Sequence, residues 1–299
     1  MRKVVLVLGA SGLFGSHAAR AFQVAGWEVQ RYRRGTDMIA AAKGADVIVN
    51  GLNPPAYHAW AKLVPRITRQ AITAAEASGA TLIVPANVYV YGTQPGPWGP
   101  DTPQVPVSRK GAIRAAAEAE YRAASARGVQ VILLRGGDFV APDAPNSFWN
   151  MVTLKNLSRG KITTMAAPEV KRAYAYLPDM ARIAVALAEK RDELPAFTDL
   201  PFAGFTLSMA EMKTEMEHLA WRALRLSHFP WWLMTLASPF WELARELREM
   251  RYLYDLPHEL DNRPLEKLLP DFHATPMRAV LAAHLPEAQG RASLIQTGR

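Results

Sequence analysis

A glycine-rich turn near the start of the chain has the residue types and spacing of a phosphate-binding loop. Gly9, Gly12 and Gly15 recur at every third position, directly after the apolar run 4–8. Glycines let backbone N–H groups approach a pyrophosphate, and the N-terminus of the following helix adds partial positive charge. A turn placed between a first strand and a first helix favours a dinucleotide site over a purely structural turn. We expect the dinucleotide to contact Gly9, Ser11, Gly12, Leu13, Phe14 and Gly15.

Basic residues end the next apolar segment, where folds of this kind bind the ribose of a dinucleotide. The segment closes with Arg31, Arg33 and Arg34, and the first carboxylate after them is Asp37, which we interpret as a helix cap. A carboxylate at this place binds ribose hydroxyls, whereas guanidinium groups bind a 2′-phosphate in a bidentate way. The three arginines therefore favour NADP(H). The alternative is a solvated basic turn.

The elements that must position these residues alternate between strands and helices. We predict strands over 4–8, 27–32, 45–49, 81–85 and 129–134, and helices over 15–25, 38–43, 57–78 and 113–127. Strands this apolar, separated by helices, indicate a parallel sheet covered on both faces. With right-handed crossovers the fold class is α/β, a Rossmann-type doubly wound parallel sheet.

The alternation weakens after residues 142–146, and the chain from about residue 190 is mostly helical and rich in Met and Trp. We predict a Rossmann domain over residues 1–189 and a smaller, mostly helical C-terminal substrate lobe over residues 190–299. Residues 142–172 are expected to contribute to that lobe. The alternative is a single domain whose C-terminal part packs on the sheet.

Composition limits the chemistry that these elements can carry. The 299 residues include no cysteine, which excludes disulfides, thiolate metal sites and cysteine nucleophiles. Lys and Arg exceed Asp and Glu by 8, and the pI is about 9.8. Such an excess suits nucleic acid, an acidic membrane or a phosphate-bearing ligand. Nucleic acid is the weakest of the three, because the basic residues are dispersed and form no stripe interleaved with aromatic residues.

No segment has the length of a membrane span. The longest late apolar stretch, 229–241, is broken by Pro230 and Pro239, and about 20 apolar residues are needed to cross a bilayer. Helix packing is our first interpretation of this stretch, and contact with a membrane surface or a partner helix is the alternative. The apolar run after the first residues is too short for a signal peptide, so we expect a soluble, cytoplasmic protein.

Short motifs follow the glycine turn in a recognisable order along most of the chain. They are Asn50-Gly51-Leu52-Asn53, Val90-Tyr91-Gly92, Arg135-Gly136-Gly137-Asp138-Phe139 and Tyr176-Leu177-Pro178-Asp179. In this order the chain resembles the extended, NAD(P)-dependent epimerase/dehydratase-like branch of the short-chain dehydrogenase/reductase superfamily, as an atypical member. The resemblance implies a homodimer through a two-helix face. It also implies cofactor contacts at Gly51, Leu52, Asn53, Gly136, Gly137, Asp138 and Phe139.

The catalytic set of that branch is altered in this chain. Asn87 stands where the family has Ser or Thr, and Lys110 and Arg114 stand where it has Tyr and Lys of a Tyr-x-x-x-Lys pair. A phenol beside an ammonium passes a proton during hydride transfer. We expect Asn87 to orient a carbonyl, Lys110 to replace the phenol and Arg114 to hold the ribose. Tyr91 and Tyr89 are substitute proton donors, with strand packing as the alternative.

A second departure lies between Arg34 and Ala45. The family has a further strand there, but in this chain the gap holds only a turn and one short helix. We therefore expect the third strand of the sheet to be missing or vestigial, which leaves the adenine side of the site more open.

Two functions stay open at this point. One is an NADP(H)-dependent oxidoreductase or epimerase-like enzyme acting on a small carbonyl or alcohol substrate. The other is a non-catalytic NADP(H)-binding sensor or regulatory protein. Aromatic residues at strand ends and in the lobe, such as Tyr57, Trp98 and Trp149, suit a ring-bearing or apolar substrate at least as well as a sugar nucleotide. Neither metal-ligand spacing nor a serine-hydrolase elbow occurs in the sequence.

Overall fold

A six-stranded parallel sheet forms the centre of the computed structural model, which describes residues 3–285. The strand order is β2-β1-β3-β4-β5-β9, and every pairing between neighbours is parallel. The strands are β1 (Val4–Leu8), β2 (Glu28–Arg31), β3 (Val47–Asn50), β4 (Thr81–Ala86), β5 (Val131–Gly136) and β9 (Phe197–Phe202). Their nearly continuous apolar sequences suit a sheet that is buried on both faces. The predicted α/β fold class is confirmed.

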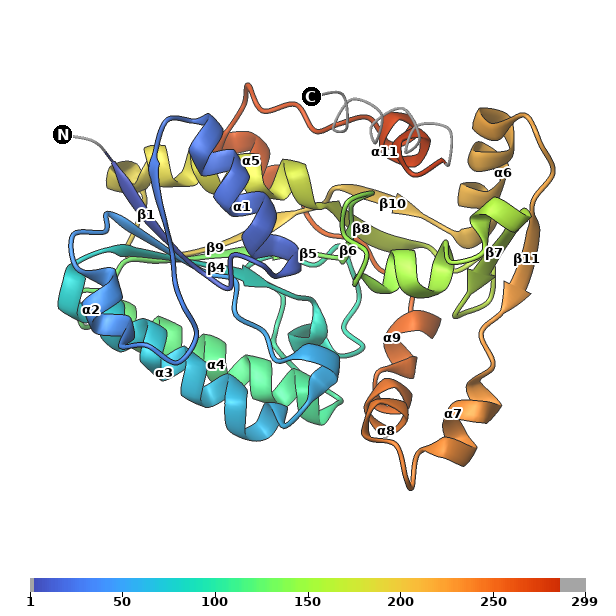
Figure 1. Ribbon diagram of the computed structural model, residues 1–299, viewed down its shortest axis with the longest axis horizontal. Coiled ribbons are helices and arrows are strands. Elements are labelled where there is room, and N and C mark those ends of the chain that lie inside the picture. The colour runs from blue at the N-terminus through green and yellow to red at the C-terminus, as the bar shows by residue number, and fades with distance from the viewer. Residues whose placement is uncertain (1–2, 286–299) are drawn as a thin grey trace.

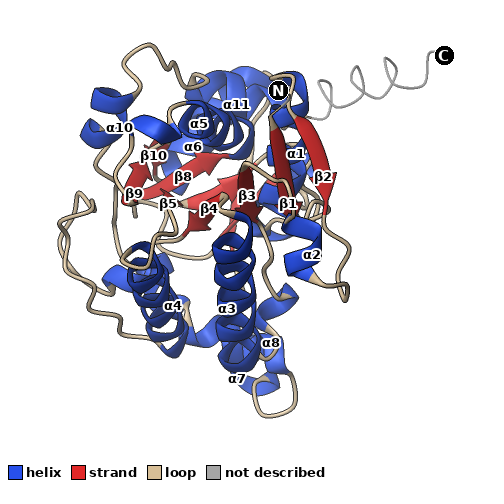
Figure 2. Ribbon diagram, turned by 90° about the vertical axis from the view of Figure 1, so that its left-hand side faces the viewer, coloured by secondary structure: helices blue, strands red, loops and turns tan. Residues whose placement is uncertain are grey.

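Helices cover both faces of this sheet (Figures 1 and 2). One face carries α1 (Leu13–Val24) and α5 (Leu177–Glu189), and the other carries α2 (Met38–Ala42), α3 (Trp60–Ser78) and α4 (Arg109–Ser125). Each face has its own buried apolar cluster. Val5 and Leu6, consecutive on β1, belong to different clusters because successive side chains of a strand point to opposite faces.

Side-chain caps start two of the helices that matter for the site. Asp37 accepts hydrogen bonds from the N–H groups of Ile39 and Ala40, so it caps α2 as predicted. Ser108 accepts a hydrogen bond from the N–H of Gly111 and begins α4 four residues earlier than the predicted boundary. The earlier start places Lys110 in the first turn of α4.

The missing third strand is confirmed. Between β2 and β3 the chain forms only α2 and its flanking turns, and β2 is the edge strand of the sheet within residues 3–285. The carboxyl end of β2 therefore has one neighbouring strand, β1.

The C-terminal lobe lies at the end of the sheet toward which β5 and β9 run (Figure 1). β6 (Asp138–Val140) and β10 (Phe205–Leu207) follow these two strands and pair with β8 (Arg172–Tyr176), while β7 (Lys161–Thr164) pairs with β11 (Arg225–His228). The helices of this part of the chain are α6 (Met209–Ala220), α7 (Trp231–Ala237), α8 (Glu242–Glu249), α9 (Arg251–Asp255), α10 (Arg263–Leu268) and α11 (Met277–Ala283).

The predicted start of the lobe at residue 190 needs one correction. Residues 197–202 form β9, which pairs with β5 along six residues and belongs to the main sheet. The strand was hidden because Asp199 and Pro201 interrupt its apolar sequence. Residues 142–172 contribute β7, which pairs with β11.

A buried histidine in the lobe makes stability depend on pH. His258 stacks on Trp98, with ring centroids 4.9 Å apart, and burial together with the charge of Arg172 lowers the pKa of His258 to about 4. An unfolded histidine titrates near pH ~6.5, so the unfolded state takes up the proton first as the pH falls. Neutral His258 therefore contributes fully to the free energy of unfolding above pH ~6.5. As the pH falls from there to about 4, the free energy of unfolding decreases by up to roughly 3 kcal/mol.

We expect the variant His258→Phe to lose less stability than the wild type over that pH range, as measured by urea unfolding at a series of pH values. A residual slope should remain, because burial also lowers the pKa of His17 and of His284. An unchanged slope in the variant would show that His258 is not the group responsible.

Candidate functional site

The glycine turn is packed tightly against the end of β3. Gly9 has a φ of 75°, a left-handed conformation that favours glycine, and its carbonyl accepts a 2.8 Å hydrogen bond from the N–H of Gly12. A Cβ atom at Gly15 would lie 2.1 Å from the carbonyl oxygen of Gly9. A Cβ atom at Gly9 would lie 2.8 Å from the carbonyl oxygen of Gly51. The backbone of the turn can take this course only with glycine at these positions.

The N-terminus of α1 is free of capping side chains. Gly12 is its N-cap, no side chain accepts from its first N–H groups, and the first turn holds no acidic residue. These N–H groups have no partner within the helix, so they can bind an anion. Ser11 is exposed beside them, whereas Leu13 and Phe14 pack their side chains against the core and offer only backbone groups.

The turn after β3 is held by a side-chain amide. Asn50 is buried, its Oδ1 accepts a 3.3 Å hydrogen bond from the N–H of Leu52, and its Nδ2 donates to the Tyr121 hydroxyl at 3.0 Å. This arrangement fixes Gly51 and Leu52 beside Gly9, and Asn53, the residue after them, accepts a hydrogen bond from Arg114 of α4. Of the predicted cofactor residues 51–53, the first two therefore lie next to the glycine turn.

The three arginines after β2 lie beside the same turn. Arg31 is in register with Val7, and the N–H of Tyr32 donates to the Val7 carbonyl at 3.0 Å. Arg31, Arg33 and Arg34 are exposed, and none of their guanidinium groups has an ion-pair partner among residues 3–285. Three unpaired cations thus lie at the carboxyl end of β2, the strand that pairs with β1 ahead of the glycine turn.

Lys110 is bound by two carboxylates of the C-terminal lobe. Its ammonium contacts Glu246 and lies 3.0 Å from Glu249, and its backbone N–H donates to Glu249 at 3.0 Å. The side chain is buried and lies over the ring of Tyr57. This geometry joins α8 to the start of α4, so the structure does not present Lys110 as the free proton donor that the sequence suggests.

Arg114 is held between the turn after β3 and the first residue of α3. Its Nη2 donates to Oδ1 of Asn53 at 2.7 Å, and its guanidinium lies 4.6 Å from the centre of the Trp60 ring. Its Nε is buried and has no hydrogen-bond partner among the described residues. Burial lowers the pKa of Arg114. Because a buried donor without an acceptor is destabilising, a ribose hydroxyl is a suitable missing partner.

A pair of tyrosines, Tyr57 and Tyr89, packs against the Trp60 ring that Arg114 also contacts. Tyr89 and Arg114 flank the same indole ring of Trp60, and the Tyr89 hydroxyl lies 3.1 Å from that of Tyr57. Asn87 directs Tyr89 there by accepting a 3.0 Å hydrogen bond from its N–H. Burial raises the pKa of Tyr89 and raises that of Tyr57 well above its ordinary value. Both phenols are therefore protonated at neutral pH, and burial makes each of them a weaker acid than an exposed tyrosine.

Tyr91 does not reach this group. Its side chain is 1% exposed and packs against Trp98, and its hydroxyl donates to the carbonyl of Gly99 at 3.1 Å. The short 3-10 helix Tyr89–Tyr91 turns the two tyrosines in different directions. Of the two tyrosines, only Tyr89 contacts Tyr57 and Trp60.

Gly136 and Gly137 serve the packing of strands. A Cβ atom at Gly136 would lie 2.8 Å from Cβ of Ala175, and one at Gly137 would lie 2.1 Å from the carbonyl oxygen of Ala173. Both positions bring β5 and β6 close to β8. The side chain of Asp138 pairs with Arg172, and Phe139 packs against the core, so these predicted cofactor residues are engaged within the protein.

Several residues of this region were not found from the sequence. They are Glu246 and Glu249, which bind Lys110, and Arg172, which binds Asp138 and has a buried Nε without a partner among the described residues. The i, i+4, i+7 spacing of Glu242, Glu246 and Glu249 was the available signal, but the same spacing is typical of a solvated helix face.

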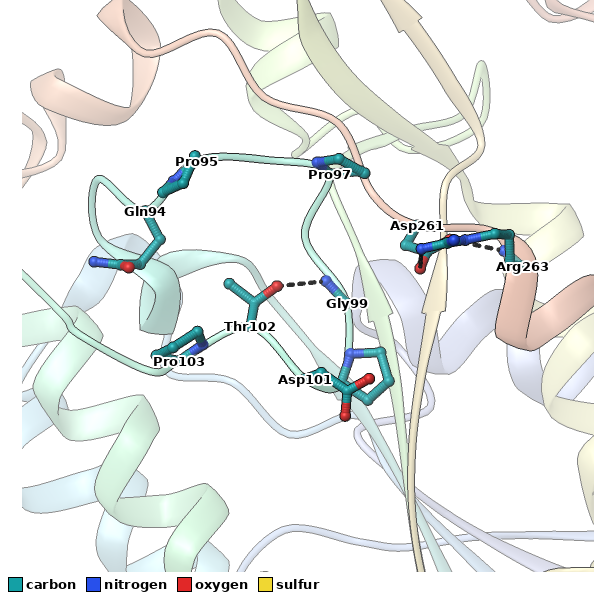
Figure 3. Close-up of a pocket in the computed structure, with 10 residues that line it drawn as sticks. Gln94, Pro95, Pro97, Gly99, Asp101, Thr102, Pro103, Asp261 and Arg263 are labelled. Atoms are coloured by element: carbon teal, nitrogen blue, oxygen red, sulfur yellow. Dashed lines mark hydrogen bonds and ion pairs between the residues drawn. The ribbon is translucent and has the colours of Figure 1, made fainter.

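A surface pocket of about 250 Å³ lies away from the glycine turn, on the proline-rich loop after Tyr91 (Figure 3). A 2.9 Å hydrogen bond from the N–H of Gly99 to Thr102 Oγ1 and a 2.8 Å ion pair between Arg263 and Asp261 stabilise its walls. Its lining contains none of the predicted cofactor residues, so we do not place the dinucleotide there. The lining residues are Gln94, Pro95, Pro97, Gly99, Pro100, Asp101, Thr102, Pro103, Asp261 and Arg263.

Solved structures with the same architecture are known. UDP-glucuronic acid 4-epimerase from Bacillus cereus, solved with UDP-glucuronic acid and NAD, superimposes with a TM-score of 0.75 at 16% identity, over 96% of this chain and 99% of that chain. The chain shares the epimerase fold. MoeE5, solved with UDP-glucose and NAD, gives a TM-score of 0.75 at 18% identity, over 97% and 99% of the two chains. The NAD-dependent NDP-hexosamine 5,6-dehydratase TunA gives a TM-score of 0.71 at 15% identity, over 97% of this chain and 98% of that chain.

The epimerase fold extends over nearly the whole chain, lobe included, which confirms the architecture that the sequence resemblance implies. No protein-family model and no curated protein matches the sequence. The likeness is therefore one of fold, and the activity of this chain has to be argued from its own residues.

Proposed function

We propose that the chain binds NADP(H) and acts as an oxidoreductase or epimerase-like enzyme on a small carbonyl or alcohol. The observation that carries the proposal is the cradle formed by Gly9, Gly15 and Gly51, in which a Cβ atom at any of the three would lie 3.0 Å or less from a backbone oxygen. Such close packing leaves the loop backbone and the start of α1 open to a pyrophosphate. The unpartnered Nε of Arg114 supports a ribose at the other end of the site.

The preference for NADP(H) rests on the three unpaired arginines after β2. We expect the double variant Arg33→Gln/Arg34→Gln to bind NADPH about tenfold or more weakly, because charged hydrogen bonds to the 2′-phosphate are lost. Binding of NADH should stay unchanged, since it lacks that phosphate. Isothermal titration with both cofactors measures the difference, and Lys62→Gln, an exposed cation on α3, is the matched control. Equal losses for both cofactors would contradict the assignment.

The chain's own residues can hold and protonate a carbonyl substrate. When bound, the nicotinamide supplies or accepts a hydride. The Nδ2 of Asn87 has no partner among the described residues and can donate to a carbonyl oxygen. Tyr89, backed by the Tyr57 hydroxyl and near the Arg114 guanidinium, can deliver a proton to that oxygen. Reduction of a carbonyl requires a protonated donor, and both phenols are protonated at neutral pH, although burial makes each of them a weaker acid.

The experiment that tests the proposal measures NADPH binding and then turnover on a panel of carbonyl compounds and UDP-sugars. UDP-sugars are included because two neighbours of the same fold were solved with them. Consumption of NADPH reports net reduction, and product analysis reports epimerisation, which consumes no net NADPH. The proposal would be overturned if the chain bound neither NADPH nor NADH.

Tyr89→Phe should lower kcat by about 100-fold or more while NADPH affinity stays unchanged, because only the proton donor is removed. Tyr91→Phe is the matched control: it removes a hydroxyl from the same short helix, but one that donates to the Gly99 carbonyl. We expect its kcat to match the wild type. If Tyr91→Phe lost kcat and Tyr89→Phe kept it, Tyr91 and not Tyr89 would be the proton donor.

The ion pairs of Lys110 favour a second function. An ammonium held by Glu246 and Glu249 stands where the family resemblance places the catalytic tyrosine. A non-catalytic NADP(H) sensor would have no need of a proton donor there. Tight NADPH binding without turnover on any member of the panel, together with a stable protein partner, would support the sensor.

A further inference from the structure

Helix α7 is apolar and has no buried side chain. Its sequence, Trp-Trp-Leu-Met-Thr-Leu-Ala, has one polar residue, Thr235, and none of its seven residues is buried. Trp232 is 64% exposed and Leu236 67%, and Phe240 in the following turn is 95% exposed. Leu233 and Trp241 are exposed as well. We call the set Trp232, Leu233, Leu236, Phe240 and Trp241 the α7 tip.

Helices α7 and α8 and the turn between them form a helical hairpin. Polar contacts hold the base of this hairpin and leave the α7 tip free. The indole N–H of Trp231 donates to the carbonyl of Met165 at 2.8 Å, and Arg248 donates to Ser238 Oγ at 2.7 Å across the turn. Glu242 on α8 accepts from the ring of His58 at 2.8 Å. Figure 1 shows α7, α8 and the turn between them projecting beyond the rest of the molecule, and Figure 2 places them at one end of α3. The tip is a convex projection on a fixed base.

Cations without carboxylate partners lie on α8 and at the start of α3, which Glu242 joins to α8 through His58 and the N–H of Ala59. The three carboxylates of α8 face the nucleotide-binding part of the chain, where they bind His58, Arg109 and Lys110. Arg248, on the other side of α8, has no ion-pair partner among residues 3–285. The same is true of Lys62 and Arg66, which are exposed in the first turns of α3. The two elements next to α7 and its turn thus offer cations that no carboxylate of the described residues neutralises, in a chain whose net charge is +8.

These features point to one occupant, a lipid bilayer with anionic headgroups. Tryptophan and phenylalanine next to arginine and lysine form the usual pattern of segments that lie in the membrane interface. The exposed tip offers roughly 500 Å² of apolar surface, less than the ~800 Å² per partner that a stable dimer buries. A convex tip also suits a deformable bilayer better than a second rigid copy of the chain.

We infer that the α7 tip inserts into the interface of an anionic membrane and that Arg248, Lys62 and Arg66 bind the headgroups. Such binding is peripheral, because no helix within the described part of the chain is long and apolar enough to cross a bilayer. The inference does not depend on the proposed function, since none of these residues belongs to the candidate site.

Cosedimentation of the full chain with vesicles tests this inference. We expect binding to vesicles of phosphatidylcholine mixed with phosphatidylglycerol, weaker binding to phosphatidylcholine alone, and a decrease as the salt concentration rises. Phe240→Ser and Trp232→Ser should each weaken binding by about tenfold. Trp221→Ser is the matched control, because Trp221 is 94% exposed at the end of α6, away from the α7 tip.

Three outcomes would overturn the inference. The first is no binding of the wild type to anionic vesicles. The second is an equal loss in Trp221→Ser, which would mean that any exposed tryptophan suffices. The third is a dimer that sedimentation velocity finds in the wild type and not in Phe240→Ser, which would assign the tip to a second copy. An unchanged melting temperature and an unchanged far-ultraviolet circular dichroism spectrum show that a variant is folded.

Discussion

Replacing Arg135 by methionine is expected to lower the free energy of unfolding by about 3–5 kcal/mol at neutral pH. The guanidinium of Arg135 is fully buried on β5 and donates to Glu118 of α4 at 2.8 and 3.0 Å and to Asp199 of β9 at 2.7 and 3.2 Å. Burial acts to lower the pKa of Arg135, but the two carboxylates hold it well above its ordinary value. Methionine would leave two buried carboxylates without their cation, which is the source of the loss.

Urea unfolding of this variant should be compared with that of Arg127→Met. Arg127 also pairs with a glutamate, Glu76, at 2.7 Å, but its side chain is 55% exposed. An exposed ion pair contributes little, so Arg127→Met should change stability by about 0.5 kcal/mol or less. A loss below about 1 kcal/mol in Arg135→Met would show that the buried carboxylates find other partners or take up protons at little cost.

Loss of Arg135 should also disturb the candidate site. Its Nη1 donates to the carbonyl of Asn87 at 2.5 Å, and Asn87 in turn directs Tyr89 toward Tyr57. We therefore expect Arg135→Met to lower kcat as well as stability, without a direct contact to substrate. The Arg135 network links the stability of the sheet to the geometry of the proton donor.

Local signals explain what the sequence predicts correctly. The turn between β1 and α1 and the Asp37 cap depend on residues within a few positions of one another. The missing third strand follows from chain length alone, since the ten residues between Arg34 and Ala45 hold a turn and a short helix but no further crossover. Such features are fixed by backbone geometry and spacing, so they can be predicted without knowledge of the tertiary structure.

Contacts between distant segments explain what the sequence does not predict. Lys110 aligns with the family tyrosine, but its partner Glu246 is 136 residues away in the chain, and residue type alone does not reveal that pairing. β9 was missed because a carboxylate such as Asp199 is uncommon in a buried strand. Only the tertiary structure shows that Arg135 of β5 forms an ion pair with it. Tyr89 and Tyr91 look equivalent in sequence, and only the turn after β4 separates the phenol near Arg114 from the one that bonds Gly99.

The substitution Gly15→Ala separates the effect of helix propensity from that of close packing. The two effects predict changes of opposite sign in the free energy of unfolding. Alanine in place of a helical glycine ordinarily stabilises by about 1 kcal/mol. At Gly15 the added Cβ would lie 2.1 Å from the carbonyl oxygen of Gly9 and 2.8 Å from its carbonyl carbon, both backbone atoms that cannot rotate away. We expect a net loss of about 2–4 kcal/mol in urea unfolding.

Gly26→Ala is the control for backbone conformation. Gly26 has a φ of 82° and open space where a Cβ would stand, so alanine there should cost about 1–2 kcal/mol through backbone strain alone. The two variants differ in cofactor binding: α1 can relieve the Gly15→Ala clash only by moving away from Gly9, which takes its N-terminus away from the pyrophosphate. We expect NADPH affinity to fall by about tenfold or more in Gly15→Ala and to be unchanged in Gly26→Ala. Wild-type NADPH affinity in a destabilised Gly15→Ala would mean that the close approach of helix and strand serves the fold and not the cofactor.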